Sequence, residues 1–321
     1  MTLKMNLEYW KISLQNPEPV IDDYYIFDEI IVEDENLIKK VERLRDLIIA
    51  YCVMREKDKK SSGEIIDEIY EILNSTKYIQ YTEFVAFWKV LDLSFSVFKE
   101  SQNNKSILYE ILEKYCEKRR RLYNRLGYSN IVVQALYDSG ASRKKGTAGI
   151  EKVLSIAREK LGLEKQLNTI EEVKNFNMGY FLPDKGDEKL FTLFCEVYGI
   201  KYEFGKEHQG KNPDIVLKVG EHFFIIEAKH IKESGGAQDK QIVELIKFIS
   251  YQEEKENIHY VSFLDGTYFN KFIYANSNAN KIENQKEDIE KCLKENPQNF
   301  FVNTAGLCCL FSDLRGYIEH T

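Results

Sequence analysis

Apolar residues recur at intervals of three and four positions through the first part of this chain. From about residue 36 to residue 126, this period predicts helices over Leu37–Val53, Gly63–Leu73, Thr82–Phe98 and Ser106–Leu126. Segments rich in Ser, Gly and Asn separate the apolar runs and are typical of loops. We therefore expect a mainly helical domain over residues 1–126.

The pattern changes in the second part, where short apolar runs alternate with helical periods. Ile215–Val219 and Phe223–Ile226 are joined by Gly220-Glu221, which predicts a β-hairpin. Further along, we expect a helix within Gln238–Glu254, a strand over Ile258–Leu264, a helix over Glu287–Asn296, and a strand or buried helix over Phe300–Phe311. The prediction is an α/β domain over residues 127–321, with a mixed central sheet flanked by helices.

Charged residues stand at the open end of the predicted hairpin. Pro213-Asp214 precedes its first strand, and Glu227-Ala228-Lys229 follows the apolar run of its second. Because side chains alternate across a strand, Glu227 and Lys229 project from one face. Pairing in register brings Asp214 close to Glu227. Two carboxylates and an ammonium group are therefore expected to converge.

These groups suit the metal-assisted hydrolysis of a phosphodiester. Mg²⁺ and Mn²⁺ prefer oxygen ligands, which Asp214, Glu227 and the backbone carbonyl of Ala228 would supply. The ion would lower the pKa of a bound water and neutralise charge on the phosphate. Lys229 would orient or deprotonate that water, or stabilise the pentacovalent phosphorus, and the sequence leaves these roles open. In the alternative structural interpretation, Glu227 and Lys229 simply extend into solvent.

The constellation resembles the PD-(D/E)XK nuclease superfamily over about residues 130–270. Within it, the chain looks most like a type II restriction endonuclease, because the basic stretch Arg143–Lys145 precedes a predicted helix carrying Glu151, and Ser234-Gly235-Gly236 opens the helix after the triplet. The resemblance implies sequence-specific, magnesium-dependent cleavage of double-stranded DNA by a homodimer, with Glu151 as an auxiliary acidic group. Two alternatives remain: a structure-selective or modification-dependent repair nuclease, and a non-catalytic DNA-binding protein.

Charge is distributed unevenly along the chain. Its net charge is −7, yet residues 114–145 hold nine basic and two acidic residues, a net +7, which leaves −14 for the rest. Such segregation suits a protein that contacts phosphates with one face, although a solvated helix face gives the same pattern. The residues that we expect to contact DNA are Lys118, Arg119, Arg121, Arg143, Lys144, Lys145, Gln238 and Lys240. The helical domain would then serve recognition or dimerisation.

Composition excludes several other classes of protein. With 321 residues, of which 43% are hydrophobic and 30% charged, the chain has the composition of a globular protein. It contains no apolar run of eighteen residues, and Met1–Met5 lacks the apolar core of a secretory signal, so we expect a cytoplasmic protein. None of the six cysteines has zinc-ligand spacing, and we expect all of them to be reduced and packed.

Overall fold

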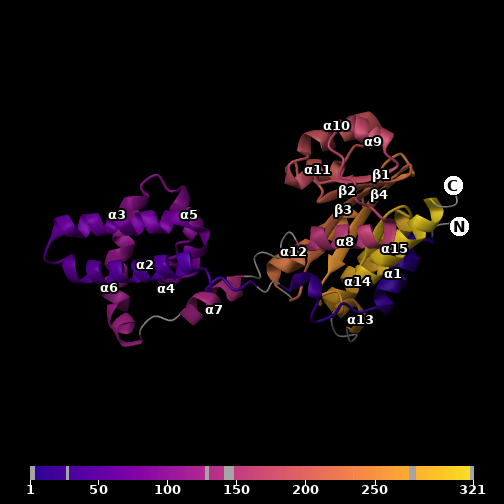
Figure 1. Cartoon of the computed structure of the whole chain (residues 1–321). Coiled ribbons are helices and arrows are strands. Elements are labelled where there is room, and N and C mark those ends of the chain that lie inside the picture. The colour runs from indigo at the N-terminus through magenta and orange to yellow at the C-terminus, as the bar shows by residue number, and fades with distance from the viewer. Residues whose placement is uncertain are drawn as a thin grey trace. The chain divides into compact units, whose positions relative to one another are not determined.

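The computed structural model describes residues 4–26, 29–126, 130–140, 148–233, 235–274 and 280–318. The chain divides into two compact units, one of residues 27–144 and one that combines residues 1–26 with residues 145–321 (Figure 1). The boundary expected from the sequence lies after residue 126. The N-terminal segment packs with the sheet-containing unit because its helix α1 (Asn6–Gln15) contacts α15 (Thr304–Ile318) and the strand β5 (Phe300–Val302).

The unit of residues 27–144 is helical, as the apolar period predicted. Its longer elements are α2 (Glu35–Met54), α3 (Lys59–Ser75), α6 (Asn104–Leu126) and α7 (Asn130–Gly140). The prediction of one continuous helix over Thr82–Phe98 is wrong. The segment is divided into α4 (Glu83–Phe87), a 3₁₀ turn η3 (Trp88–Leu91) and α5 (Phe95–Glu100). The helix ends because Asp92 adopts a left-handed conformation with φ 55°. Ser94 then accepts a hydrogen bond from the Val97 backbone N–H, which starts the next helix.

Two cysteines of the helical unit form a disulfide, so the expectation that all six are reduced is wrong for this pair. Cys52 on α2 and Cys116 on α6 are bonded, with their Cα atoms 5.6 Å apart. The pairing follows from the packing of α2 against α6, which brings together residues 64 positions apart in the sequence. Sequence spacing carries no signal of such a contact, whereas Cys195, Cys292, Cys308 and Cys309 are free thiols.

The other unit is built on a five-stranded mixed sheet, which confirms the predicted α/β class. Its strand order is β1-β2-β3-β4-β5, with bounds Met178–Phe181, Ile215–Val219, His222–His230, Ile258–Asp265 and Phe300–Val302. Strand β2 pairs antiparallel with both β1 and β3, whereas β3, β4 and β5 run parallel to one another. The hairpin predicted around Gly220 is therefore correct, and Gly220 has the positive φ of 61° that such a turn needs.

Helices cover both faces of this sheet (Figure 1). On one face, α8 (Ala148–Leu161) and α15 pack against each other and against the sheet. On the other face lie α10 (Glu188–Tyr198), α12 (Gly236–Phe248) and α14 (Asn280–Glu295). Shorter elements of this unit are η1 (Asp23–Tyr25), α9 (Ile170–Asn175), η5 (Pro183–Lys185), α11 (Glu203–Glu207) and α13 (Lys271–Tyr274). Strand β1 and these short elements were not predicted.

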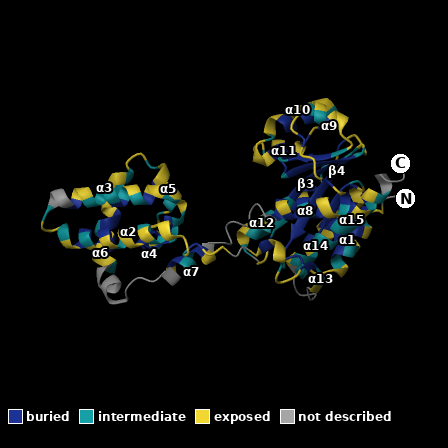
Figure 2. Cartoon of the chain, in the orientation of Figure 1, coloured by how far each residue is buried: buried dark blue, intermediate teal, exposed yellow. Residues whose placement is uncertain are grey.

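Strand β3 is buried on both faces, and its side chains alternate between the two helical layers. Phe223 and Ile225 pack in the layer that contains α10 and Phe248 of α12, whereas Phe224 and Ile226 pack with α8 and α15. The central strands are accordingly dark blue in Figure 2. None of the helices in the described residues is long and apolar enough to cross a membrane.

Candidate metal-binding site

The open end of the β2–β3 hairpin brings the predicted carboxylates together. Ile215 pairs with Ile226, so the residue before β2, Asp214, stands opposite Glu227. The Ala228 backbone N–H donates a hydrogen bond to Asp214 Oδ2 across 2.8 Å. Burial raises the pKa of Asp214, and the positive charge of Lys229 partly offsets this increase. Asp214 is thus held in place by the backbone of the same triplet that carries Glu227.

Glu227 is the least accessible charged group of this cluster. Its side chain is 0% exposed, and its Oε1 accepts hydrogen bonds from Lys211 and Lys229, each with an N–O distance of 2.5 Å. Its Oε2 is buried and has no hydrogen-bond partner in the described part of the chain. Burial, followed by the negative charge of Asp214, raises the pKa of Glu227 to about 7.

Two residues of the cluster were missed by sequence reasoning. Lys211 lies three residues before Asp214, and Glu244 lies on α12, which covers this face of the sheet. Lys211 bridges the Glu227 and Glu244 carboxylates, while Lys229 lies 4.0 Å from Glu244. Burial raises the pKa of Glu244, but its bond to Lys211 and the neighbouring lysine charges outweigh burial, so the net shift is downward. Glu244 occurs within a helical period and no local pattern distinguishes it.

A second carboxylate cluster lies at the end of β4, on the face covered by α8. Asp265, the last residue of β4, pairs in register with His230 of β3. Carboxylate oxygens of Glu18, Asp22 and Asp265 lie within 4.8 Å of one another, and this group could hold a metal ion. Lys152 of α8 reaches all three carboxylates, at 3.7, 2.6 and 2.8 Å respectively.

The atoms of this second cluster are extensively paired. Asp265 Oδ1 accepts from Lys152 and from the Gly266 backbone N–H, and its Oδ2 accepts from the Tyr25 hydroxyl and contacts His230 Nδ1 at 3.0 Å. Burial raises the pKa of Asp265, but the His230 and Lys152 interactions outweigh it and hold that pKa well below the usual range. Burial and the charge of Asp265 raise the pKa of Glu18 to about 7.

Few features of the sequence predict this second cluster. Asp265 directly follows a buried strand, which was visible as a strand end, but Glu18 and Asp22 come from a segment more than 200 residues away. Lys152 is 1% exposed, whereas its neighbour Glu151, the predicted auxiliary acid, is exposed in the first turn of α8. The helix therefore turns its lysine inward and its glutamate outward. Both clusters lie at the carboxyl ends of the parallel strands β3 and β4, the edge where α/β sheets bind ligands.

The remaining predicted DNA contacts within the described residues lie on α6 of the helical unit and on α12 of the sheet-containing unit. Lys118 is exposed on α6, and the Arg119 guanidinium lies 5.4 Å from the centre of the Phe87 ring. Gln238 is half-buried and Lys240 exposed on α12. Arg143, Lys144 and Lys145, and the side chain of Arg121, fall outside the described residues.

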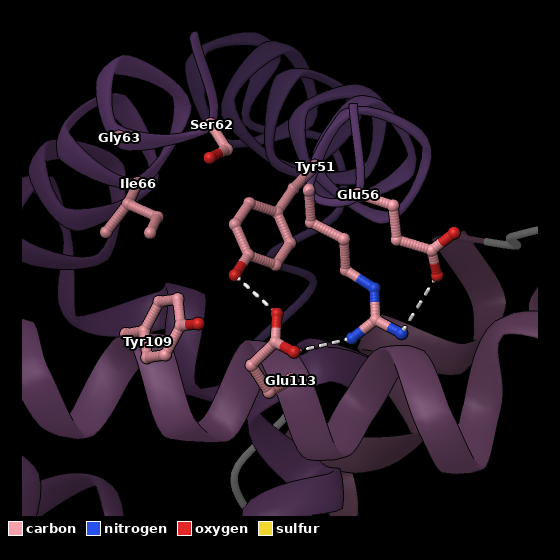
Figure 3. Close-up of a pocket in the computed structure, with 8 residues that line it drawn as sticks. Tyr51, Glu56, Ser62, Gly63, Ile66, Tyr109 and Glu113 are labelled. Carbon is pink, nitrogen blue, oxygen red and sulfur yellow. Dashed lines mark hydrogen bonds and ion pairs between the residues drawn. The ribbon is translucent and has the colours of Figure 1, made fainter. Parts of the chain in front are cut away.

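The helical unit contains a polar cavity of about 450 Å³ between α2, α3 and α6 (Figure 3). Its charged groups pair with one another: Glu113 accepts hydrogen bonds from the Tyr51 hydroxyl and Arg55, and Arg55 also lies 3.6 Å from Glu56. These pairings join α2 to α6 near the disulfide. Arg55 Nε is buried without a partner among the described residues, but the cavity lacks an unpaired carboxylate oxygen like that of Glu227.

The chain matches no protein-family model, no curated protein and no solved structure.

Proposed function

We propose that this chain is a magnesium-dependent endonuclease of the PD-(D/E)XK type, which hydrolyses phosphodiester bonds in double-stranded DNA. The observation that carries the proposal is the state of the Glu227 carboxylate. It is fully buried, two lysines share one of its oxygens, and the other oxygen has no partner within the described residues. A buried and unpaired carboxylate oxygen is costly, and a bound cation would offset that cost.

The surrounding residues suit a hard divalent cation. Asp214 and Glu227 supply two carboxylates, and the backbone carbonyl of Ala228 is the proposed third protein ligand. Mg²⁺ commonly binds through one or two carboxylates and leaves its other positions to water and phosphate. When bound, the ion supplies an acidified water and a charge that stabilises the phosphate. The group Glu18, Asp22 and Asp265 supports metal binding more generally, but Lys152 already supplies positive charge among its oxygens.

Lysine and acidic side chains around the pocket have separate proposed roles. Lys229, 20% exposed and 2.5 Å from Glu227, is placed to hold or accept a proton on an attacking water, or to stabilise charge on the phosphate. Lys211 balances the charges of Glu227 and Glu244. Glu151 remains the proposed auxiliary acid, because it is exposed in the first turn of α8, where a Cβ atom on Gly149 would lie 3.9 Å from the Cβ atom of Ala228.

Sequence-specific cutting of the restriction type is the finer part of the proposal. It rests on the resemblance of the Asp214, Glu227 and Lys229 pattern and on the positive charge of residues 114–145. Residues of that segment, with Gln238 and Lys240, are the proposed DNA contacts. A homodimer would present two such pockets to the two strands of a palindromic site.

The test compares plasmid cleavage by the wild type and by Asp214→Asn in the presence of Mg²⁺. The asparagine side chain keeps an oxygen for the Ala228 N–H but loses the negative charge that strengthens the binding of a divalent cation. We expect discrete fragments from the wild type and a loss of rate on the order of 10²–10³-fold in the variant, as for the loss of one group that stabilises transition-state charge.

Glu221→Gln is the matched control for that experiment. Glu221 is an exposed carboxylate in the turn at the other end of the same hairpin, so its substitution should leave cleavage unchanged. The proposal fails if Asp214→Asn cuts at the wild-type rate, or if wild-type cleavage persists with excess EDTA. A smear or single nicks in place of discrete fragments would retain the nuclease and remove the restriction-type specificity.

A further inference from the structure

A second buried polar atom without a partner lies near the Glu227 pocket. The side chain of Tyr202 is 7% exposed, and its hydroxyl is buried without a hydrogen-bond partner in the described part of the chain. A buried phenol normally bonds to a neighbour, because its desolvation is otherwise uncompensated.

Three of the charges that act on this phenol belong to the proposed metal pocket. Burial raises the pKa of Tyr202, and the next largest cause is the negative charge of Glu227, followed by contributions from Cys195, Asp214 and Glu244. No hydrogen bond joins the Tyr202 hydroxyl to any of these carboxylates, although a hydroxyl is a donor and a carboxylate an acceptor. An unpaired donor and the unpaired Glu227 Oε2 therefore share one neighbourhood and do not satisfy each other.

Tight packing connects the Tyr202 ring to the pocket. A Cβ atom on Gly205 would lie 2.6 Å from the ring and 2.9 Å from the Lys211 carbonyl oxygen, so only glycine permits this approach. Lys211 in turn contacts Glu227 Oε1 at 2.5 Å. Tyr202 and Lys211 also share the wall of a cavity of about 640 Å³ lined by α10 and α11. The Tyr202 ring therefore packs beside the backbone of Lys211, whose ammonium group contacts Glu227.

The backbone at Tyr202 is strained and is held in place. Its φ of 42° is in the left-handed region, which large side chains seldom adopt. The Glu253 carboxylate accepts hydrogen bonds from the backbone N–H groups of Lys201 and Tyr202, at 2.9 and 3.0 Å, and from the Tyr260 hydroxyl at 2.7 Å. Two of these hydrogen bonds hold the backbone at Tyr202 in this conformation, and the third fixes the Glu253 carboxylate that accepts them.

We propose that Tyr202 is a positioning residue of the metal pocket, whose hydroxyl hydrogen-bonds to an oxygen atom that occupies the pocket beside Glu227. The oxygen belongs either to water carried with the metal ion or to the phosphate of the substrate. This inference rests on the proposed function, because it takes Glu227 as a metal ligand. Groups in this position orient the ligands that touch the metal, and their loss typically weakens metal binding 10–100-fold.

The experiment uses two single-atom deletions on stacked rings. Tyr202 and Tyr260 lie 6.3 Å apart with an interplanar angle of 10°, and both are buried, but only the Tyr260 hydroxyl has a described partner. Mg²⁺ affinity is measured by calorimetry, and thermal stability is measured in EDTA, for the wild type, Tyr202→Phe and Tyr260→Phe. Affinity for a DNA duplex is measured with and without Mg²⁺.

We expect opposite results from the two variants. Tyr202→Phe should bind Mg²⁺ about 10–100-fold more weakly and keep the wild-type thermal midpoint, since no hydrogen bond within the protein is lost. Tyr260→Phe should lower the thermal midpoint and keep the Mg²⁺ affinity. If only the DNA affinity of Tyr202→Phe falls, and only with Mg²⁺ present, the oxygen is that of the phosphate.

Failure of the proposed role of Tyr202 and failure of the proposed metal site would give different binding results. If the wild type binds Mg²⁺, Asp214→Asn does not, and Tyr202→Phe matches the wild type in both Mg²⁺ and DNA affinity, the role of Tyr202 is refuted and the metal site stands. If the wild type and Asp214→Asn give the same heat on Mg²⁺ addition, the proposed metal site is refuted, and the role of Tyr202 is refuted with it.

Discussion

Two carboxylate clusters lie at the carboxyl ends of β3 and β4 on opposite faces of the sheet, and their lysines differ. Lys152 is 1% exposed and lies among Glu18, Asp22 and Asp265, whereas Lys211 and Lys229 are 30% and 20% exposed and approach one oxygen of Glu227. The first arrangement pairs its carboxylates within the protein, although the Nε2 atom of His230 beside Asp265 is buried without a partner among the described residues. The second leaves a carboxylate oxygen and a phenol hydroxyl unpaired within the described residues.

We propose that the difference separates an ion-pair network at Glu18, Asp22 and Asp265 from a ligand site at Glu227. A compact acidic triad meets the geometric requirement for metal binding, and only the Glu18, Asp22 and Asp265 group does so among the described residues. Lys152, at the centre of this group, nevertheless already balances carboxylate charge that a metal ion would otherwise balance. The distances between carboxylates therefore favour Glu18, Asp22 and Asp265 as the metal site. The unpaired buried atoms favour the cluster around Glu227.

The largest expected effect is the loss of Lys152. Lys152→Met removes the ammonium from three carboxylates, and breaking a buried pair in this way typically costs about 3–5 kcal/mol of unfolding free energy. Urea denaturation measures it. Lys229→Met should cost less than Lys152→Met, because Lys229 is partly exposed and its partner Glu227 keeps Lys211.

Adding Mg²⁺ to the Lys152→Met protein sharpens the same comparison. If the acidic triad holds a metal once the lysine is gone, millimolar Mg²⁺ should restore part of the lost stability. Equal destabilisation by the two lysine substitutions would remove the distinction between the clusters.

The next effect concerns pH. Without divalent ions, the folded-state pKa of Glu227 is about 7, above its ordinary value near 4.5, so the folded state binds more protons than the unfolded state between these values. The unfolding free energy should therefore fall as pH rises from about 4.5 to about 7. Glu227→Gln keeps an oxygen for the lysines and should reduce this slope, measured by urea denaturation in EDTA across that range.

Glu18 provides the internal reference for the pH experiment. Its pKa is also raised to about 7, so Glu18→Gln should reduce the slope in the same direction. Above pH 7, saturating Mg²⁺ should stabilise the wild type and have no effect on Glu227→Gln. A slope that is identical in the wild type and Glu227→Gln would refute the assigned protonation of Glu227.

Substitution of Glu151 should have the smallest effect. Its side chain is exposed, so Glu151→Gln should change the unfolding free energy by less than about 0.5 kcal/mol. As an auxiliary group, it should lower the cleavage rate by about tenfold or less, below the 10²–10⁴-fold attributed to a positioned proton-transfer group. Steady-state cleavage assays decide the point, and complete inactivity would give Glu151 a central role.

Local sequence signals predicted the hairpin and the approach of Asp214 to Glu227. Two apolar runs joined by Gly220, with charged residues at the open end, are sufficient because strand alternation and antiparallel register are local rules. The helix expected over Thr82–Phe98 failed for a related reason. A period of apolar residues does not reveal that Asp92 turns left-handed.

Sequence alone therefore determined the α/β class and the common face of Glu227 and Lys229. The tertiary structure decided which side chains complete the two clusters: Lys211, Glu244 and Tyr202 on one face of the sheet, and Glu18, Asp22 and Lys152 on the other. Local periodicity encodes the direction of a side chain relative to its own strand or helix. The packing of distant segments selects its partners, and those partners decide whether a buried charge is already satisfied or still requires a ligand.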